Sequence, residues 1–505
     1  MALIAVSVTY LAYCFYQYSL NVAAPQVAAD LNGMALFSWA ISIPALASAL
    51  ATLIFGKLSD MYGRRNVMIA SLSFFLLGSV LSAMSQDFVF NIAARFILAL
   101  GQGALAPLIF SVLGDLFDPA ERSKWSGLLA IPAGITAFIA PTLVGMVADS
   151  LSWRYFFWLL ALTAIISGAF VLIGVPSLKQ RSEHKIDFLG AVLLTFASAT
   201  TIVGFSWAGT TYPWGSIQII GTLGIAIVGW GLFLWTESQA AEPMLDLQVL
   251  TNRTFITAAL AALMSFFGLM GITAYYPLFL QGVQNASATL SGQMITPFSV
   301  LMSFMGVPAG FLLAKTKRYK WMYVIGYAIL TVAMFGMMTF GVDTPIWLGV
   351  LVTALAGLGL GTIPTINTLV AQFAVPRRLL GAATGAIFFF VMMGMAIAPA
   401  ILGSAMNASY ASALQNALPA ELQKSADPAT LSAIGDPRVL LSPQAMTTLK
   451  ESFARQGAQG SALFDQTVVA IRSALEASLK TVYLIGAVTM LLSFLMILTI
   501  PEISM

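Results

Sequence analysis

The sequence predicts an all-α membrane protein, a bundle of fourteen membrane-spanning helices built as two six-helix halves with two further helices inserted between them. Three observations predict this fold: the composition, the length of the apolar runs and an internal repeat. Of the 505 residues, 59% are hydrophobic and only 9% are charged, whereas a soluble domain is about 45–50% apolar. No segment alternates apolar and polar residues like a membrane β-strand, so we expect helices.

Fourteen runs contain the roughly 20 predominantly apolar residues that a helix needs to cross a bilayer. The first run has no basic stretch before it and no clear cleavage site, so we expect a span and not a signal peptide. Its Cys14 is the single cysteine and excludes an intramolecular disulfide. The runs lie near residues 3–26, 37–57, 67–86, 89–114, 125–148, 154–175, 188–208, 216–236, 254–282, 291–314, 321–341, 346–371, 380–406 and 481–500.

The basic residues predict the orientation of the bundle. They lie in loops after even-numbered spans, which by the positive-inside rule face the cytoplasm. The opposite short loops contain only Arg154, at the start of a span. We therefore predict a protein of the plasma membrane, in bacteria the inner membrane, with both termini cytoplasmic. The predicted cytoplasmic residues are Lys57, Arg64, Arg65, Arg122, Lys124, Lys179, Arg181, Lys185, Arg253, Lys315, Lys317, Arg318, Lys320, Arg377 and Arg378.

The loop between the second and third runs carries an unusual concentration of charge. It reads Gly-Lys-Leu-Ser-Asp-Met-Tyr-Gly-Arg-Arg from Gly56 to Arg65. Gly56 and Gly63 permit a close backbone approach and a chain reversal, and Asp60 can cap a helix or form a local ion pair. A loop that only fixed orientation would need the basic residues but not the placed aspartate and glycines.

The two halves share residues at a fixed spacing. Gly101, Gly103 and Gly127 recur 258 positions later as Gly359, Gly361 and Gly385, and Ile139-Ala140-Pro141 with Gly145 recurs as Ile397-Ala398-Pro399 with Gly403. A weaker match at a spacing of 254 sets Gly56, Asp60 and Arg64 against Gly310, Ala314 and Arg318. Repeated halves around a midplane cavity are a transporter architecture.

The repeat divides the chain into three parts. Residues 1–175 form the N-terminal half, residues 176–253 form a linker that holds the inserted seventh and eighth helices, and residues 254–505 form the C-terminal half. The C-terminal half includes an outer segment, 407–480, with four prolines in its first part and a helical spacing of apolar residues near its end. We expect this segment to lead directly into the last span, either as a lid over the outer mouth or as a passive helical extension.

These motifs resemble the major facilitator superfamily, and the fourteen spans resemble its drug:proton antiporter branch. The loop at Gly56 to Arg65 resembles the signature loop between helices two and three of the family. Three further stretches are similar to family motifs: residues 94–103 in helix four, residues 115–122 in the loop that follows, and residues 153–157 at the start of helix six. The resemblance covers nearly the whole chain.

The resemblance implies a gate. It implies that Asp60, Arg64 and Asp115 form a charge network that holds the halves together in the outward-open state, and that Pro141 and Gly145 let helix five pack closely and bend. The candidate gating residues are Gly56, Asp60, Gly63, Arg64, Arg65, Asp115, Pro141 and Gly145.

The sequence departs from the family pattern at two places. The helix-five motif usually reads Gly-Pro-x-x-Gly-Gly, and here residues 140–145 keep Pro141 and only the last glycine. In helix one, relatives often carry an acidic residue five positions before Asn21, and here Tyr16 stands at that position. The carboxylate that commonly binds a proton or cation is therefore missing.

Arg95, about seven residues into the fourth run, is predicted to lie inside the membrane. Placing a charged side chain in the bilayer costs free energy, so an ionisable residue there indicates a functional role. The resemblance implies that this arginine faces the interior and takes part in proton movement, and the alternative is a structural pairing with backbone carbonyls. The nearest acid on helix one is Asp30. We therefore predict Arg95 and Asp30 as a coupling pair, against the alternative that Asp30 is a solvated helix end.

We expect a largely apolar or neutral cavity, because no acidic residue falls in the middle of a span. Neutral polar and aromatic residues of helices one, nine and twelve could orient a ligand, although hydrogen bonding between helices is the commoner role for such residues. The candidates are Gln17, Tyr18, Asn21, Tyr275, Tyr276, Gln281 and Asn367.

Several classes of function are excluded. The net charge of +3 comes from loops without a basic, aromatic-rich stripe, so we expect no nucleic acid partner. There is no metal-ligand cluster, no phosphate-binding glycine loop and no catalytic constellation, so we expect neither a metal, nor a cofactor, nor an enzyme.

We predict a monomeric secondary transporter that exports lipophilic or cationic drugs or lipids by alternating access with proton antiport. The alternatives are a lipid flippase or uncoupled facilitator, for which the missing carboxylate argues, and a membrane sensor or scaffold that does not transport.

Overall fold

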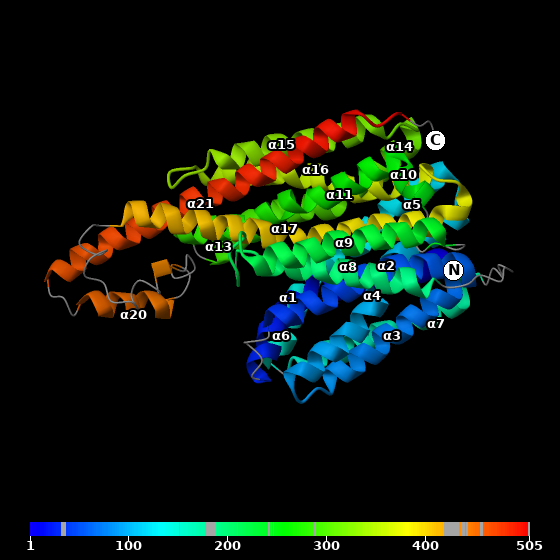
Figure 1. Cartoon of the computed structure of the whole chain (residues 1–505), viewed down its shortest axis with the longest axis horizontal. Helices are drawn as coiled ribbons and strands as arrows, with labels where there is room; N and C mark the ends of the chain where they lie inside the picture. Colours follow the sequence, from blue (N-terminus) through cyan, green and yellow to red (C-terminus); the bar gives the residue numbers. More distant parts are fainter. Residues whose placement is uncertain are drawn as a thin grey trace.

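The computed structural model describes residues 1–31, 37–150, 152–176, 187–209, 211–240, 243, 245, 247–286, 288–418, 434–435, 440, 443–454 and 458–502. Figure 1 shows one elongated bundle of helices in which both chain ends lie at the same end. We call this the inner end and the opposite end the outer end.

The N-terminal half consists of six spans. They are α1 (Ala2–Asp30), α2 (Phe37–Tyr62), α3 (Arg64–Ala83), α4 (Phe88–Leu116), a fifth span formed by α5 (Pro119–Leu128) and α6 (Ala130–Ser150), and α7 (Arg154–Gly174). α4 is the most deeply buried, because it packs against both α2 and α3, while α1 packs against α6 and α7.

The inserted pair, α8 (Phe188–Trp207) and α9 (Ile217–Gln239), forms an antiparallel hairpin. Figure 1 shows it between the two halves, and α8 contacts both α2 and α17. Glu237, near the end of α9, is 2% exposed and accepts a hydrogen bond from the Leu245 amide at 3.0 Å. The predicted seventh and eighth spans therefore cover one side of the junction between the halves.

The short α10 (Leu247–Thr251) ends the predicted linker. The C-terminal half follows with α11 (Arg253–Met270), which continues through η2 (Gly271–Tyr275), α12 (Tyr276–Leu278) and η3 (Phe279–Val283). η2 and η3 are π-helical turns on either side of Pro277, whose missing amide breaks the regular hydrogen bonding. The half is completed by α13 (Ala288–Phe304), α14 (Gly306–Thr316), α15 (Lys320–Met338), α16 (Ile346–Phe373), η4 (Arg377–Leu379), α17 (Leu380–Ala417), α20 (Pro443–Ala454) and α21 (Ala458–Leu498).

Thirteen helical segments among the described residues are long and apolar enough to cross a membrane. They match the predicted spans from the second onward in order. The first predicted span coincides with α1, which is not among the thirteen. The all-helical fold is thus confirmed, and the count of fourteen stays a prediction.

The repeated glycines occupy equivalent helix contacts in the two halves. A Cβ on Gly103 would overlap the Ser48 backbone of α2, and one on Gly361 would lie 2.7 Å from the Met302 carbonyl oxygen of α13. At both positions, glycine lets two helices approach more closely than any side chain would allow. The spacing seen in the sequence therefore reflects a repeated packing arrangement.

The ends of the last two spans differ from the predicted 380–406 and 481–500. α17 runs on to Ala417 and α21 begins at Ala458, so both helices continue into the outer segment, and Figure 1 shows them projecting with α20 beyond the bundle. Tyr410 donates a hydrogen bond to the Ile434 carbonyl at 2.8 Å, and Leu449 and Phe453 join the core of the C-terminal half. These described contacts of the outer segment are with the C-terminal half, which favours the helical extension over the lid.

The orientation can be tested on α15, which has an exposed residue near each end: Lys317 before it and Asp343 after it. With the buried Cys14 replaced by serine, a cysteine at position 317 is expected to react only with reagent admitted to the cytoplasm, and one at position 343 only from outside. Labelling of intact cells with an impermeant maleimide measures this. The reverse pattern would overturn the predicted orientation.

Candidate functional site

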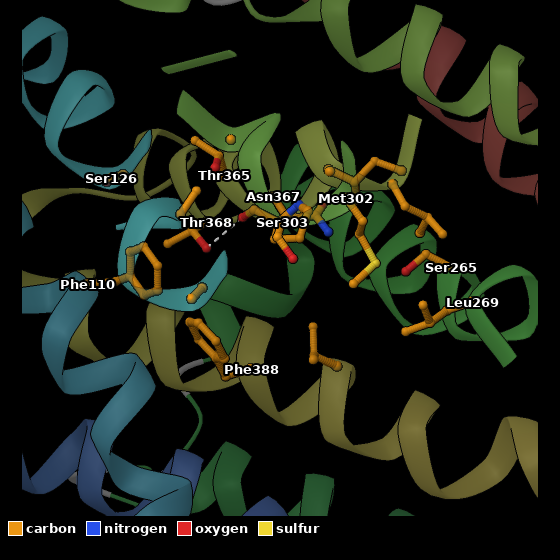
Figure 2. A pocket seen from close by; sticks show the side chains of 18 of the residues that line it. Phe110, Ser126, Ser265, Leu269, Met302, Ser303, Thr365, Asn367, Thr368 and Phe388 are labelled. Atoms are coloured by element: carbon orange, nitrogen blue, oxygen red, sulfur yellow. Dashed lines mark hydrogen bonds between the residues drawn. The ribbon is translucent and has the colours of Figure 1, made fainter. Parts of the chain in front are cut away.

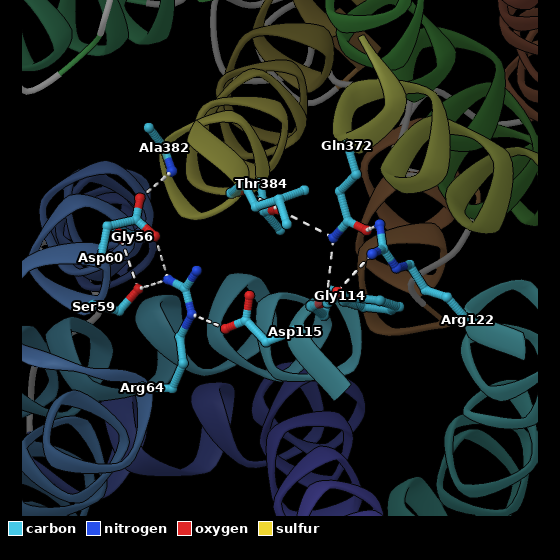
Figure 3. Close-up of polar contacts among 12 residues, drawn as sticks. Gly56, Ser59, Asp60, Arg64, Gly114, Asp115, Arg122, Gln372, Ala382 and Thr384 are labelled. Atoms are coloured by element: carbon cyan, nitrogen blue, oxygen red, sulfur yellow. Dashed lines mark hydrogen bonds and ion pairs between the residues drawn. The ribbon is translucent and has the colours of Figure 1, made fainter. Parts of the chain in front are cut away.

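A charge network lies at the inner end, where α2 ends and α3 begins (Figure 3). Gly63 joins the two helices with φ 86°, a conformation that glycine adopts without strain. Arg64 Nη1 lies 2.6 Å from Asp60 Oδ1, and Arg64 Nε lies 2.7 Å from Asp115 Oδ2. The structure thus brings together three of the predicted gating residues, while Arg65 is half-buried beside them on α3.

Asp60 also connects the two halves. Its Oδ2 accepts a hydrogen bond at 2.9 Å from the backbone amide of Ala382, in the first turn of α17. The first amides of a helix have no partner within the helix, and the helix dipole adds positive potential there. A carboxylate of the N-terminal half is therefore held at a helix N-terminus of the C-terminal half.

Glycines permit this contact between α2 and α17. A Cβ on Gly381 would overlap the Asp60 carboxylate, and one on Gly385 would lie 2.5 Å from the Thr52 carbonyl oxygen. Gly56 faces them, since its own Cβ would lie 3.1 Å from Gly385 Cα. Gly56 therefore packs closely against α17 across the two halves, and its gating role stays a prediction.

A second crossing between the halves has the same construction. A Cβ on Gly127 of α5 would lie 2.6 Å from the Gly306 carbonyl oxygen, and one on Gly310 of α14 would overlap the Ser123 carbonyl oxygen. The repeat relates Gly310 to Gly56 and Gly127 to Gly385. Ala314 stands here in place of Asp60, so this crossing lacks the carboxylate of the first.

Beside the second crossing, Gln372 of α16 joins four helices (Figure 3). Arg122 donates to Gln372 Oε1 at 3.2 Å and to the Gly114 carbonyl at 2.5 Å. Gln372 Nε2 in turn donates to the Phe110 carbonyl at 3.2 Å and to Thr384 Oγ1 at 3.1 Å. Buried polar groups need such partners, so this network stabilises the contact between the two halves.

A cavity of about 240 Å³ lies between the halves (Figure 2). Phe110 of α4 and Phe388 of α17 stack with ring centroids 5.6 Å apart, so an aromatic pair from both halves lies in its wall. Tyr10, Tyr13 and Tyr18 of α1 line it from one side. Ser126, Ser265, Ser303, Thr365, Asn367 and Thr368 supply the polar groups, and the described lining residues include no Asp, Glu, Lys, Arg or His.

Two of the seven predicted cavity residues, Tyr18 and Asn367, line this cavity. Gln17 lies outside it and accepts a hydrogen bond from Gln102 at 3.2 Å. Tyr276 is 1% exposed in the core of the C-terminal half. The other predicted residues of helix nine also have partners elsewhere: Tyr275 donates to the Pro399 carbonyl at 3.5 Å and Gln281 to Ser291 Oγ at 3.4 Å.

Three predicted residues have side chains outside the described part of the structure: Asn21 of α1, and Pro141 and Gly145 of α6. Their assigned roles stay predictions.

Arg95 is buried, at 2% exposure, and is the eighth residue of the 29-residue α4. It faces the hydroxyl of Tyr16, the residue that stands where relatives often carry an acid. Its Nε and Nη2 have no hydrogen-bond partner among the described residues. The arginine is therefore intramembrane, as predicted, and its described neighbour is a neutral tyrosine.

The predicted pair of Arg95 with Asp30 is wrong. Asp30 lies at the outer end, where its Oδ2 accepts from the Trp153 indole at 2.9 Å and from Arg154 Nη1 at 3.2 Å. These hydrogen bonds from Trp153 and then Arg154 lower the pKa of Asp30, so the carboxylate stays ionised at neutral pH. Arg154 had been available in the sequence as a partner, because it is the single basic residue of the short outer loops.

A comparison with known families identifies the chain. The profile of the Major Facilitator Superfamily matches residues 6–399. The chain belongs to this superfamily. It is a membrane transporter protein and not an enzyme, and the match includes the inner-end network and all the cavity residues.

Several relatives of this superfamily are named as drug or efflux transporters. The chain is 29% identical to multidrug transporter protein MdtP of Bacillus subtilis over 77% of this chain and 72% of the relative. It is 29% identical to multidrug resistance protein 3 of the same organism, over 76% and 74%. It spans 56% of the length of an uncharacterized MFS-type transporter of Mycobacterium tuberculosis, at 30% identity.

Solved structures agree on the fold. The human organic anion transporter MFSD10 matches with a TM-score of 0.59 at 14% identity, over 98% of this chain and 97% of that one. The proton:xylose symporter XylE, bound to 6-bromo-6-deoxy-D-glucose, matches with a TM-score of 0.59 at 13% identity, over 99% and 95%.

The sequence analysis missed Gln372, Ala382 and most of the cavity wall. Ala382 acts through its backbone amide, which no side-chain pattern can indicate. Gln372 lies one residue beyond the predicted span 346–371, and it reaches the junction because α16 continues to Phe373.

Proposed function

We propose that this transporter exports lipophilic small molecules by alternating access. The observation that carries the proposal is the cavity between the halves, whose described lining is aromatic, aliphatic and hydroxylic and contains no formally charged side chain. An apolar cavity with a few polar groups binds lipophilic ligands by burying their apolar surface. The names of the relatives as multidrug transporters support the same proposal.

Aromatic faces in the cavity extend the proposed substrates to delocalised organic cations. Phe110, Phe388 and Tyr10 surround one region, with Tyr10 packed edge-on against Phe110 at 5.9 Å between ring centroids. A cation over such a ring gains roughly 0.5–2 kcal/mol from the ring quadrupole. Neutral lipophiles and lipophilic cations therefore both belong to the proposed range, while compact hydrophilic ions do not.

In the proposed cycle the inner-end contacts act as the gate. With the gate closed, Asp60 holds the first turn of α17 and the glycine crossings are packed. Opening the gate separates α2 from α17 and α5 from α14 and gives the cavity access to the cytoplasm. The closed and open gates are two discrete packing arrangements of the same helices, as in other conformational switches.

We further propose proton antiport as the energy source. Protonation of Asp60 would remove the charge that Arg64 and the Ala382 amide stabilise, and would favour opening of the inner gate. The described neighbour of Arg95, Tyr16, carries no carboxylate, and this favours the alternative of an uncoupled facilitator or lipid flippase. A sensor or scaffold that does not transport remains the alternative of another class.

One reconstitution separates these functions. Purified protein in liposomes with an imposed pH gradient is expected to move a lipophilic cationic dye against its concentration gradient, and to leave a fluorescent phospholipid in its leaflet. Movement of the phospholipid instead would support the flippase, dye movement that ignores the pH gradient would support the facilitator, and binding without movement would support the sensor.

The cavity can be tested in the same vesicles. Phe388→Ala removes an aromatic face from the cavity and is expected to lower dye transport about tenfold. The dye would lose an aromatic contact and the apolar surface buried by it, which weakens binding by more than about 1 kcal/mol. Phe335→Ala, at a lipid-facing residue of α15 that is 41% exposed, is the matched control and is expected to transport like the wild type. Equal rates in both variants would contradict the cavity assignment.

A further inference from the structure

A groove lies on the surface of the inner end, where α5 of the N-terminal half crosses α14 of the C-terminal half. It has a volume of about 670 Å³ and is lined by Lys124, Pro308, Phe311, Leu312, Ala314 and Lys315. Phe311 is 45% exposed and Leu312 is 40% exposed. In a membrane protein, exposed large apolar side chains on a spanning helix face lipid, so the groove opens toward the bilayer.

A second, apolar groove of about 210 Å³ shares Pro308 and Leu312 with the first. It extends along α14, α15 and α16, and Trp321 and Ile325 lie in its wall. Thr362 is its single hydroxyl-bearing residue among those described. The two grooves together have a cationic end at the predicted membrane surface and an apolar track that leads away from it.

The two lysines of the first groove come from different halves of the protein. Lys124 belongs to α5 and Lys315 to α14, and closure of the glycine crossing brings these helices together. The described lining of the groove contains no acid, and the exposed Glu121 of α5 is not part of it. Two ammonium groups that approach each other repel, and an anion between them would offset that repulsion.

We propose that these grooves bind one anionic phospholipid of the bilayer, with its phosphate between Lys124 and Lys315 and an acyl chain along the apolar groove beside Trp321. The charge of the groove selects the headgroup, and the adjoining apolar surface selects a lipid over a soluble anion. Because the lysines belong to opposite halves, the bound lipid stabilises the closed inner gate. This site is distinct from the cavity between the halves.

The first test uses quenching of Trp321 fluorescence by brominated lipids. The emission of Trp321 is the component that the Trp321→Phe variant lacks. Brominated phosphatidylglycerol is expected to quench this component at a lower lipid concentration than brominated phosphatidylcholine. The preference should fall roughly fivefold for each of Lys124→Gln and Lys315→Gln and roughly 30-fold for the double variant, since each basic residue near an anionic surface contributes a similar increment.

The matched control is the double variant Lys317→Gln with Lys320→Gln, which neutralises two basic residues that are neighbours in sequence but do not line the groove. It is expected to keep the preference for phosphatidylglycerol. An equal loss in both double variants would overturn the site, because the preference would then come from diffuse positive charge. Competition by soluble glycerophosphate at millimolar concentration would also overturn it, in favour of a free-phosphate site.

The second test measures the gate itself. Spin labels at the exposed positions of Tyr62 and Arg378 report the distance between the halves at the inner end. Phosphatidylglycerol is expected to increase the short-distance population in the protein with both lysines, but not in the Lys124→Gln, Lys315→Gln variant. An equal increase in both would show that the lipid does not act through these lysines. This outcome is independent of which compound the protein transports.

Discussion

Asp60→Asn is expected to lower transport at least tenfold while expression and membrane insertion stay unchanged. The substitution keeps the size of the side chain and an acceptor for the Ala382 amide, but removes the charge that Arg64 and the first turn of α17 stabilise. A hydrogen bond to a charged group contributes roughly 1.5–3 kcal/mol, which corresponds to about a 10- to 150-fold shift of the gate toward the open arrangement. Dye transport in liposomes and the distance between spin labels at Tyr62 and Arg378 measure both effects.

The chain offers a matched control for this substitution at the same end of the bundle. Asp118 of the N-terminal half and Arg377 of the C-terminal half are 3.9 Å apart, with side chains 87% and 85% exposed. Exposed ion pairs contribute little, so Asp118→Asn should transport like the wild type. If Asp60→Asn did so too, the loop at Gly56 to Arg65 would fix the topology without acting as a gate.

The features that the sequence predicted well share a physical origin. Long apolar runs predict spanning helices because the backbone groups in a bilayer must form their hydrogen bonds within the protein, which a helix achieves. Such runs can be recognised without any knowledge of how the helices pack. The pairs Gly103 and Gly361, or Gly56 and Gly310, were found because backbone contact tolerates no side chain and so repeats when the packing repeats. The Asp60–Arg64 pair is local to one tight turn, whereas the contact of Arg64 with Asp115, 51 positions away, was expected from the family resemblance.

The cavity residues were predicted poorly, for a different reason. Polar residue type was the criterion, yet Gln281 and Tyr275 satisfy their hydrogen bonds within the C-terminal half. Phe110 and Phe388 line the cavity and do not differ in type from aromatic residues that face lipid. Only the tilt and rotation of each helix decide which phenylalanine faces which environment, and these depend on contacts with other helices.

The error over Asp30 shows the limit of arguments from spacing along one helix. Arg95 and Asp30 were paired because each was the nearest charge of its kind in a shared half. The structure shows that α1 is long enough to bring Asp30 to the outer end, where Trp153 and Arg154 contact it, while Arg95 faces Tyr16 in the interior.

Gly310→Ala is expected to abolish most transport by preventing closure of the inner gate. The new Cβ would overlap the Ser123 carbonyl oxygen, a backbone atom of α5 that moves only if the whole helix moves. Overpacking of this kind typically costs 1–3 kcal/mol, so the closed arrangement should become roughly 5- to 150-fold less populated. Because the overlap lies between the halves, each half should still fold, and protein yield and elution should match the wild type.

Two further variants decide whether this effect comes from the crossing or from the loss of a glycine. Gly385→Ala, at the position that the repeat relates to Gly127, should have the same effect, since its Cβ would lie 2.5 Å from the Thr52 carbonyl oxygen of α2. Gly292→Ala on α13 has nothing within 4 Å of the new Cβ and should transport normally, with a small gain in helix stability. Wild-type transport by Gly310→Ala would mean that the halves need not touch at α5 and α14 for the cycle to proceed, and the repeated glycines would then serve assembly of the bundle alone.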